Sequence, residues 1–139
     1  MPSVSSITLD LSRYTHVRIG GVSHVAVLHT LCEQNYQLLG HGYNLLVSPE
    51  ARNLAILGDT FATLAMLPNG LLRVGAALPA YKLYTYAKHN DLWGFEFLAH
   101  LPGSIGGLVK MNAGMSLATN GAIARYEICD VLAGIATAK

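Results

Sequence analysis

A glycine-rich apolar stretch at residues 96–114 constrains this chain more than any other feature of its sequence. It holds four glycines, one proline, one serine and one asparagine, and Lys110 is the only charged residue after its first position. Gly103, Gly106 and Gly107 carry no Cβ, so a ligand can approach the main chain closely. Successive N–H groups in such a bend, with a helix beginning near Gly106, favour an anion such as a diphosphate.

Two polar side chains add hydrogen-bonding groups to this stretch. Ser104 offers a hydroxyl, and Asn112 offers a side-chain amide. The same glycines are also compatible with tight packing between a turn and a helix. The stretch alone is therefore weak evidence for a ligand.

A second glycine loop, Gly40-His41-Gly42-Tyr43-Asn44, shifts the balance toward binding. It lies between apolar runs that predict strands at residues 36–39 and 45–47. Such a loop holds a phosphate if its N–H groups point inward, and it is otherwise a plain hairpin turn. It is not a Walker loop, because the Gly-Lys-Ser/Thr ending is absent. No partner at ligand spacing accompanies the loop histidine, so no metal site is predicted.

The high apolar content predicts that part of the surface is covered. Apolar residues make up 52% of the 139, and charged residues only 12%. Because monomers rarely expose large apolar patches, a ligand, a second subunit or a further part of the chain is expected there. No apolar run reaches the roughly 18 residues of a membrane helix, and a net charge of +1 gives no field for nucleic acid.

The N-terminus has no basic region ahead of an apolar core, so it does not predict a secretory signal. Cys32 and Cys129 lie far apart and form no disulfide framework. We therefore expect a cytoplasmic protein.

Hydrophobic periodicity predicts a mixed α+β fold. Residues 79–89 have helical spacing, with Pro79 where a first turn tolerates it. Residues 125–135 are β-prone, and no closing element follows, which predicts a truncated chain that self-associates through an exposed apolar edge. Besides those already named, strands are predicted at residues 7–11, 24–28, 54–57, 63–67 and 71–76, the last two forming a hairpin around Pro68-Asn69-Gly70.

Read in order, three segments resemble UDP-N-acetylenolpyruvoylglucosamine reductase. They are Thr-His-Val-Arg-Ile-Gly-Gly at residues 15–21, the glycine loop and following apolar run at residues 40–48, and residues 102–114. Val-Gly-Ala at residues 74–76 and Gly-Phe-Glu-Phe-Leu at residues 94–98 also look like that family.

The resemblance implies the N-terminal FAD-binding part of such an enzyme. The implied fold is an FAD-binding domain of the vanillyl-alcohol-oxidase/PCMH type, built of two small α+β subdomains. They are expected at residues 1–58 and 59–139, with the second incomplete. The C-terminal part, including the substrate domain, is expected to be missing.

The implied reaction is FAD-dependent, NADPH-using reduction of a nucleotide sugar, UDP-N-acetylenolpyruvoylglucosamine, to UDP-N-acetylmuramate in peptidoglycan synthesis. The family uses an arginine in a Gly-Tyr-Arg context, a serine proton donor and a glutamate near the C-terminus. None has a counterpart here, because Arg125 precedes Tyr126 in the reverse order. No catalytic residue is assigned, and the 139-residue chain is expected to be inactive.

By position, the resemblance places the FAD diphosphate and ribityl region against the two glycine loops. His41 and Tyr43 are bulkier than the family's usual residues, and Tyr14 stands where asparagine is common. The predicted cofactor-binding residues are Gly40, His41, Gly42, Tyr43, Asn44, Leu45, Pro102, Gly103, Ser104, Ile105, Gly106, Gly107, Asn112 and Ala113.

Two alternatives remain open at this point. One is a non-catalytic flavin- or nucleotide-binding module that retained the two loops after losing its catalytic half. The other is an oxidase of the wider FAD family, for which His100 is the nearby candidate for a covalent flavin link.

Overall fold

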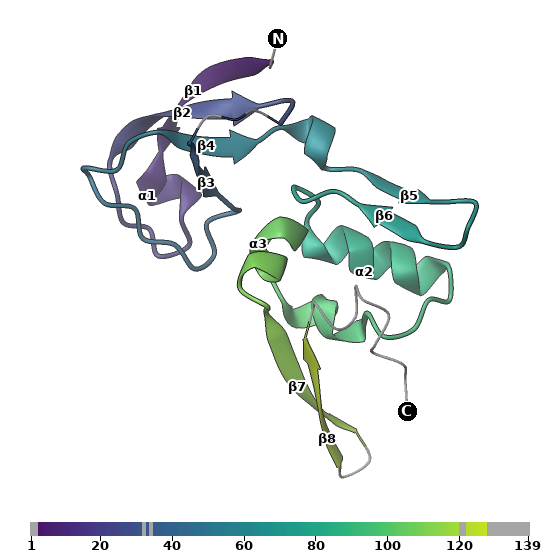
Figure 1. The fold of residues 1–139 in the computed structure, drawn as a ribbon. Coiled ribbons are helices and arrows are strands. Elements are labelled where there is room, and N and C mark those ends of the chain that lie inside the picture. The colour runs from purple at the N-terminus through teal and green to yellow at the C-terminus, as the bar shows by residue number, and fades with distance from the viewer. Residues whose placement is uncertain (1–2, 32, 34, 120–121, 128–139) are drawn as a thin grey trace.

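A computed structural model describes residues 3–31, 33, 35–119 and 122–127. It is a mixed α+β fold, as the periodicity predicts (Figure 1). In chain order the elements are β1 (Val4–Asp10), α1 (Leu11–Tyr14), β2 (Val22–Leu28), β3 (Gln37–Leu39), β4 (Leu54–Leu57), the 3-10 helix η1 (Asp59–Phe61), β5 (Leu64–Met66), β6 (Leu72–Val74), α2 (Ala80–His89), the 3-10 helix η2 (Glu96–His100), α3 (Ile105–Lys110), β7 (Gly114–Thr119) and β8 (Ala122–Glu127).

The first half of the chain forms a four-stranded sheet in the order β1-β2-β4-β3. β1 pairs antiparallel with β2, whereas β2 and β3 both run parallel to β4. The side chains of Leu11, Val25, Leu39, Val47 and Leu54 form the core beneath it. The predicted strands at residues 24–28, 36–39 and 54–57 are confirmed within two residues, and the one predicted at residues 7–11 is present but begins three residues earlier, at Val4.

Two local predictions in this half are wrong. Leu11 begins helix α1 instead of ending a strand, because the Asp10 carboxylate caps that helix by accepting from the Ser12 amide at 3.0 Å. Residues 45–47 form no strand. The Val47 side chain is buried in the core, whereas Leu46 is 68% exposed. This apolar run is therefore a loop that Val47 anchors to the core, and it pairs with none of the described strands.

The second half packs helices α2 and α3 and the 3-10 helix η2 around a separate core. The predicted hairpin is confirmed as β5 paired antiparallel with β6, and the predicted helix is confirmed as α2. Figure 1 shows α2 running beneath the hairpin, with η2 on its other side. The core residues are Leu78, Ala80, Leu83, Phe97, Leu98, Ile105 and Leu108.

Helix α3 lies between this second core and the first sheet (Figure 1). Two backbone hydrogen bonds fix its start against the segment before α2. The Ile105 amide donates to the Leu78 carbonyl at 2.9 Å, and the Ala80 amide donates to the Gly103 carbonyl at 2.8 Å. The glycine-rich stretch is thereby held facing the loop that follows β3.

The last described elements, β7 and β8, pair as an antiparallel hairpin that projects away from the helices (Figure 1). Of the predicted β-prone segment at residues 125–135, residues 125–127 form the end of β8, and the rest lies outside the described residues. In the part of the chain that the structure describes, no helix is long and apolar enough to cross a membrane.

Candidate functional site

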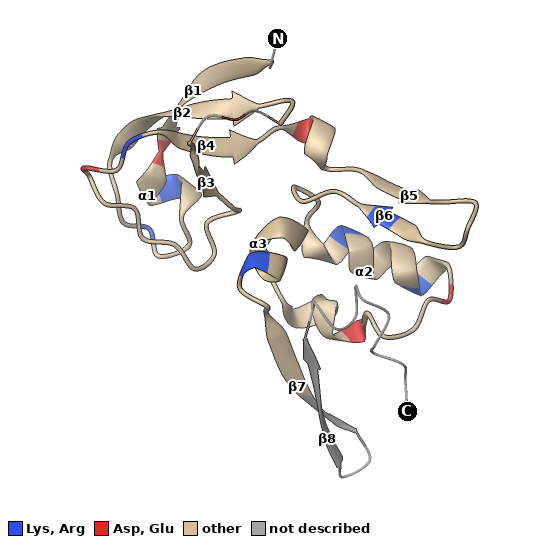
Figure 2. Ribbon diagram, viewed as in Figure 1, with Lys and Arg blue, Asp and Glu red and all other residues tan. Residues whose placement is uncertain are grey.

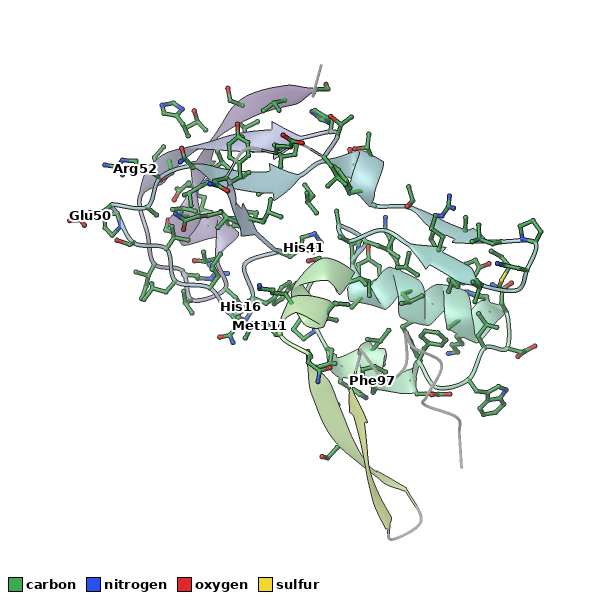
Figure 3. The ribbon with its side chains drawn as sticks, in the orientation of Figure 1. His16, His41, Glu50, Arg52, Phe97 and Met111 are labelled. Atoms are coloured by element: carbon green, nitrogen blue, oxygen red, sulfur yellow. The ribbon has the colours of Figure 1, made fainter. Side chains whose placement is uncertain are left out.

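The two glycine loops, at residues 40–45 and 102–107, meet beside one cavity. A Cβ placed on Gly40 would lie 3.5 Å from the Ser104 hydroxyl, and one on Gly103 would lie 4.0 Å from the Tyr43 ring. The cavity has a volume of about 710 Å³, within the range of small-molecule sites. Figure 3 shows His41 between the end of β3 and α3.

The first loop offers backbone N–H groups to a ligand. Among the described residues, no acceptor pairs with the amides of residues 40–45. Two carbonyls of the loop are occupied instead, since Tyr14 Oη donates to the Gly40 carbonyl and the His16 amide donates to the Gly42 carbonyl at 2.7 Å. Unpaired N–H groups in a turn are suited to an anion. These unpaired amides belong to the loop for which the sequence predicts an anion-binding backbone.

The second loop is built differently from the expectation. The predicted helix does begin there, as α3, but its first amides are used within the protein. The Gly106 amide donates to the Ala76 carbonyl at 2.8 Å, and the Gly107 amide donates to Ser104 Oγ at 3.3 Å. With the Ile105 amide also paired, none of the first three amides of α3 is left for an anion.

The second loop and α3 contribute two glycines without a Cβ and the side chains of Ser104 and Lys110 to the cavity wall. Gly106 lies so close to Ala76 that a Cβ on it would be 2.8 Å from the Ala76 Cβ. Ser104 is buried, and its hydroxyl accepts from Gly107 while its own hydrogen stays available to a ligand. Lys110, the last residue of α3, lies on the cavity wall.

The electrostatics of the cavity favour an anion. Of the described residues that line it, Lys110 carries the only full charge. Figure 2 shows one end of α3 in blue, the colour of lysine and arginine. No acidic partner lies within ion-pair distance of Lys110 among the described residues. Partial burial lowers the pKa of His41, so its imidazole is neutral at pH 7 and adds no charge.

The structure brings only some of the predicted site residues onto the cavity wall. Those on the wall are Gly40, His41, Ser104, Gly106 and Gly107. Gly42, Tyr43, Asn44 and Leu45 continue the first loop, with the Tyr43 ring stacked on His16 at 5.4 Å between centroids. The remaining predicted residues do not line the cavity. Ile105 is buried in the second core, Ala113 packs against that core, and Asn112 has a φ of +44°. The other two are Pro102 and Gly103.

Other wall residues were not predicted as site residues. Tyr14, Tyr36 and Lys110 provide its polar groups, and apolar side chains complete it. The signal for Lys110 was present, because it is the only charge in the glycine-rich stretch after Glu96. Ala76 belongs to the Val-Gly-Ala segment that the sequence singled out, whereas Tyr14 and Tyr36 are brought to the wall only by the packing of α1 and β3. The other wall residues are Leu38, Leu39, Ile56, Leu57, Ala76 and Ala77.

His100, the candidate for a covalent flavin link, ends η2. It is exposed to solvent and is absent from the cavity wall. The geometry gives the oxidase alternative no support.

Sequence comparison finds close relatives with a shared name. The chain is 44% identical over 127 residues to UDP-N-acetylenolpyruvoylglucosamine reductase of Helicobacter pylori, covering 90% of this chain and 46% of the relative. It is 43% identical over 111 residues to the enzyme of the same name from Campylobacter jejuni, covering 77% and 43%. The search with family models found no match.

A solved structure agrees with these relatives. The crystal structure of UDP-N-acetylenolpyruvylglucosamine reductase from Thermus caldophilus superposes with a TM-score of 0.66 at 27% identity, over 94% of this chain and 54% of that one. The chain thus spans about half the length of the proteins it matches.

Proposed function

Because the chain belongs to the UDP-N-acetylenolpyruvoylglucosamine reductase family, an oxidoreductase family, we propose that it is the flavin-binding portion of such an enzyme. The whole enzyme uses NADPH and FAD to reduce UDP-N-acetylenolpyruvoylglucosamine to UDP-N-acetylmuramate, in the cytoplasm, for peptidoglycan synthesis. We further propose two subdomains of the vanillyl-alcohol-oxidase/PCMH type, at residues 1–58 and 59–139. Two separate hydrophobic cores, one on each side of residue 58, support this division.

The unpaired amides of the first glycine loop are the observation that carries the proposal. A buried or half-buried N–H group without an acceptor is costly, and a bound anion removes that cost. Gly42 is buried, and its amide is one of these groups. The FAD diphosphate has negatively charged oxygens that accept hydrogen bonds from such amides. The Lys110 ammonium on the cavity wall compensates part of its negative charge.

The residues of the cavity fit FAD in three ways. The amides of the first glycine loop, of which Gly40 and His41 lie on the cavity wall, and the Lys110 ammonium would hold the diphosphate, and the Ser104 hydroxyl would donate to the same region. Gly106 and Gly107 leave the main chain open to a flat or extended ligand. When bound, FAD supplies the hydride transfer between NADPH and the substrate double bond. The chain itself binds and orients the cofactor and excludes water from it.

The first test is flavin binding by the purified chain. FAD is added, excess is removed, and the absorbance spectrum is recorded; NADPH oxidation is then followed with the enolpyruvyl substrate. We expect retained flavin and no turnover, because no described or predicted residue supplies the proton donor. Turnover by the 139-residue chain would contradict the assignment of this part as binding only, and absence of flavin would contradict the proposed site.

Lys110→Gln tests the charge on the cavity wall. Removing the ammonium is expected to weaken FAD binding about three- to tenfold at low ionic strength, with a smaller difference at 1 M salt, because salt screens the attraction to the diphosphate. Isothermal titration at both salt concentrations measures this.

The matched control is Lys82→Gln. Lys82 is an exposed lysine of α2 that is absent from the cavity wall, so the variant removes the same net charge elsewhere. Equal losses in the two variants would mean that only overall charge matters and that Lys110 does not contact the anion.

A further inference from the structure

The first glycine loop is held from one side by a single short segment, residues 14–16. Tyr14 Oη donates to the Gly40 carbonyl, and two residues later the His16 amide donates to the Gly42 carbonyl at 2.7 Å. The His16 ring also stacks on Tyr43, with an interplanar angle of 26°. Successive residues of the segment therefore contact successive parts of the loop.

These contacts set the direction of the unpaired amides. In a planar trans peptide, the C=O of one residue and the N–H of the next point in opposite directions. The bond to the Gly40 carbonyl therefore turns the His41 N–H away from residues 14–16, and the bond to the Gly42 carbonyl does the same for the Tyr43 N–H. Both amides are thus turned away from residues 14–16, and neither pairs with an acceptor among the described residues.

The holding segment is itself rigid. Helix α1 is capped by Asp10, whose carboxylate accepts from the amide and the hydroxyl of Ser12 at 3.0 and 2.6 Å. Thr15 is buried, and its hydroxyl donates to the Leu11 carbonyl at 2.8 Å. Tyr14 is thus presented from a fixed backbone, and its side chain reaches the cavity wall.

We propose that Tyr14 is the positioning residue of the anion site, which orients the amides of the first glycine loop through its hydroxyl bond to the Gly40 carbonyl. Tyr14 acts through the loop, and the loop amides contact the diphosphate. Partial burial raises the pKa of Tyr14, so the hydroxyl keeps the proton that it donates. The inference rests on the proposed flavin site.

Tyr14→Phe removes the hydroxyl and keeps the ring. We expect the affinity for FAD to fall about tenfold, as for a lost hydrogen bond of roughly 1.4 kcal/mol. The affinity for riboflavin, which has no phosphate, is expected to stay within about twofold. A residue that merely stabilised the fold would weaken both ligands, so the ratio of the two affinities identifies positioning. Fluorescence titration measures FAD, and NMR titration measures riboflavin.

Tyr81→Phe is the matched control. Tyr81 is an exposed tyrosine of α2 that is absent from the cavity wall, so the variant removes the same hydroxyl away from the site. The control is expected to bind FAD as the wild type does. In the ligand-free chain, the amide resonances of His41 and Tyr43 are expected to shift in Tyr14→Phe and not in Tyr81→Phe.

The outcomes separate the two proposals. If the wild-type chain does not prefer FAD to riboflavin, the diphosphate site is refuted. If the wild type has that preference and Tyr14→Phe retains it, the role of Tyr14 is refuted while the flavin site stands. Unchanged amide resonances of His41 and Tyr43 in ligand-free Tyr14→Phe would also refute the positioning role of Tyr14, whether or not flavin binds.

Discussion

Gly42→Ala is expected to lower the affinity of the chain for FAD by at least about a hundredfold, or roughly 2.7 kcal/mol. Gly42 has φ +75°, a left-handed conformation that costs alanine about 1–2 kcal/mol. Its Cβ would also lie 2.7 Å from the Tyr14 carbonyl oxygen and 3.1 Å from the Thr15 Cα. Because these are backbone atoms of a rigid segment, the loop has to move.

That movement acts on the site directly. Shifting Gly42 away from residues 14–16 breaks the bond from the His16 amide and displaces the unpaired amides of the loop. FAD titration by fluorescence quenching measures the loss. Affinity within about threefold of the wild type would show that the loop does not hold the cofactor.

Gly70→Ala separates conformational strain from the clash. Gly70 has φ +79°, close to that of Gly42, but a Cβ there meets no atom within 4 Å. It lies in the β5–β6 turn, where its amide donates to the Leu67 carbonyl at 2.9 Å, and it is absent from the cavity wall. This control is expected to lose about 1–2 kcal/mol of unfolding free energy and to bind FAD normally.

Gly75→Ala is expected to cost at least about 3 kcal/mol of unfolding free energy, a large fraction of the stability of a domain this size. A Cβ on Gly75 would lie 2.0 Å from the Phe61 carbonyl oxygen and 2.7 Å from the Thr63 amide nitrogen. The Gly75 amide itself donates to the Thr63 carbonyl at 2.8 Å. The chain after β6 is therefore pressed against the end of η1, and no side-chain rotation relieves the contact.

Urea unfolding followed by circular dichroism measures this effect, with the slope m expected to stay unchanged. Gly21→Ala is the matched control, because its φ is not in the left-handed region and a Cβ there meets no atom within 4 Å. If Gly75→Ala lost no more than about 1 kcal/mol of unfolding free energy beyond the control, the chain at Gly75 would have room for a Cβ, and the close contact with Phe61 and Thr63 would be contradicted.

The elements that could be predicted from the sequence are those defined by short-range chemistry. The Pro68-Asn69-Gly70 turn specifies the β5–β6 hairpin, where the Asn69 side chain accepts from the Leu71 amide at 3.1 Å. The apolar spacing after Pro79 specifies α2, whose Leu83 and Ala87 are buried. In each case the deciding contacts lie within a few residues of one another, so the local pattern is sufficient.

The wrong predictions have a common physical cause. Residues 45–47 have the composition of a strand, yet they pair with none of the described strands, and the Val47 side chain is buried in the core of the first half instead. The amides at the start of α3 were expected to be open, but the Ala76 and Leu78 carbonyls lie against them. Pairing with residues distant in sequence decides both cases, and no local pattern reports it.

The sequence by itself determined that this chain is an α+β protein with two glycine loops, and its ordered motifs pointed to the reductase family. Glycine content and turn chemistry are local properties, so they can be read directly. Only the tertiary structure decided that the two loops adjoin one cavity and that the free amides belong to the first loop. It also decided that Lys110 and Tyr14 lie on the wall of that cavity. Those facts depend on which carbonyl each amide meets, and that is settled by the packing of α1 and α3 around the cavity.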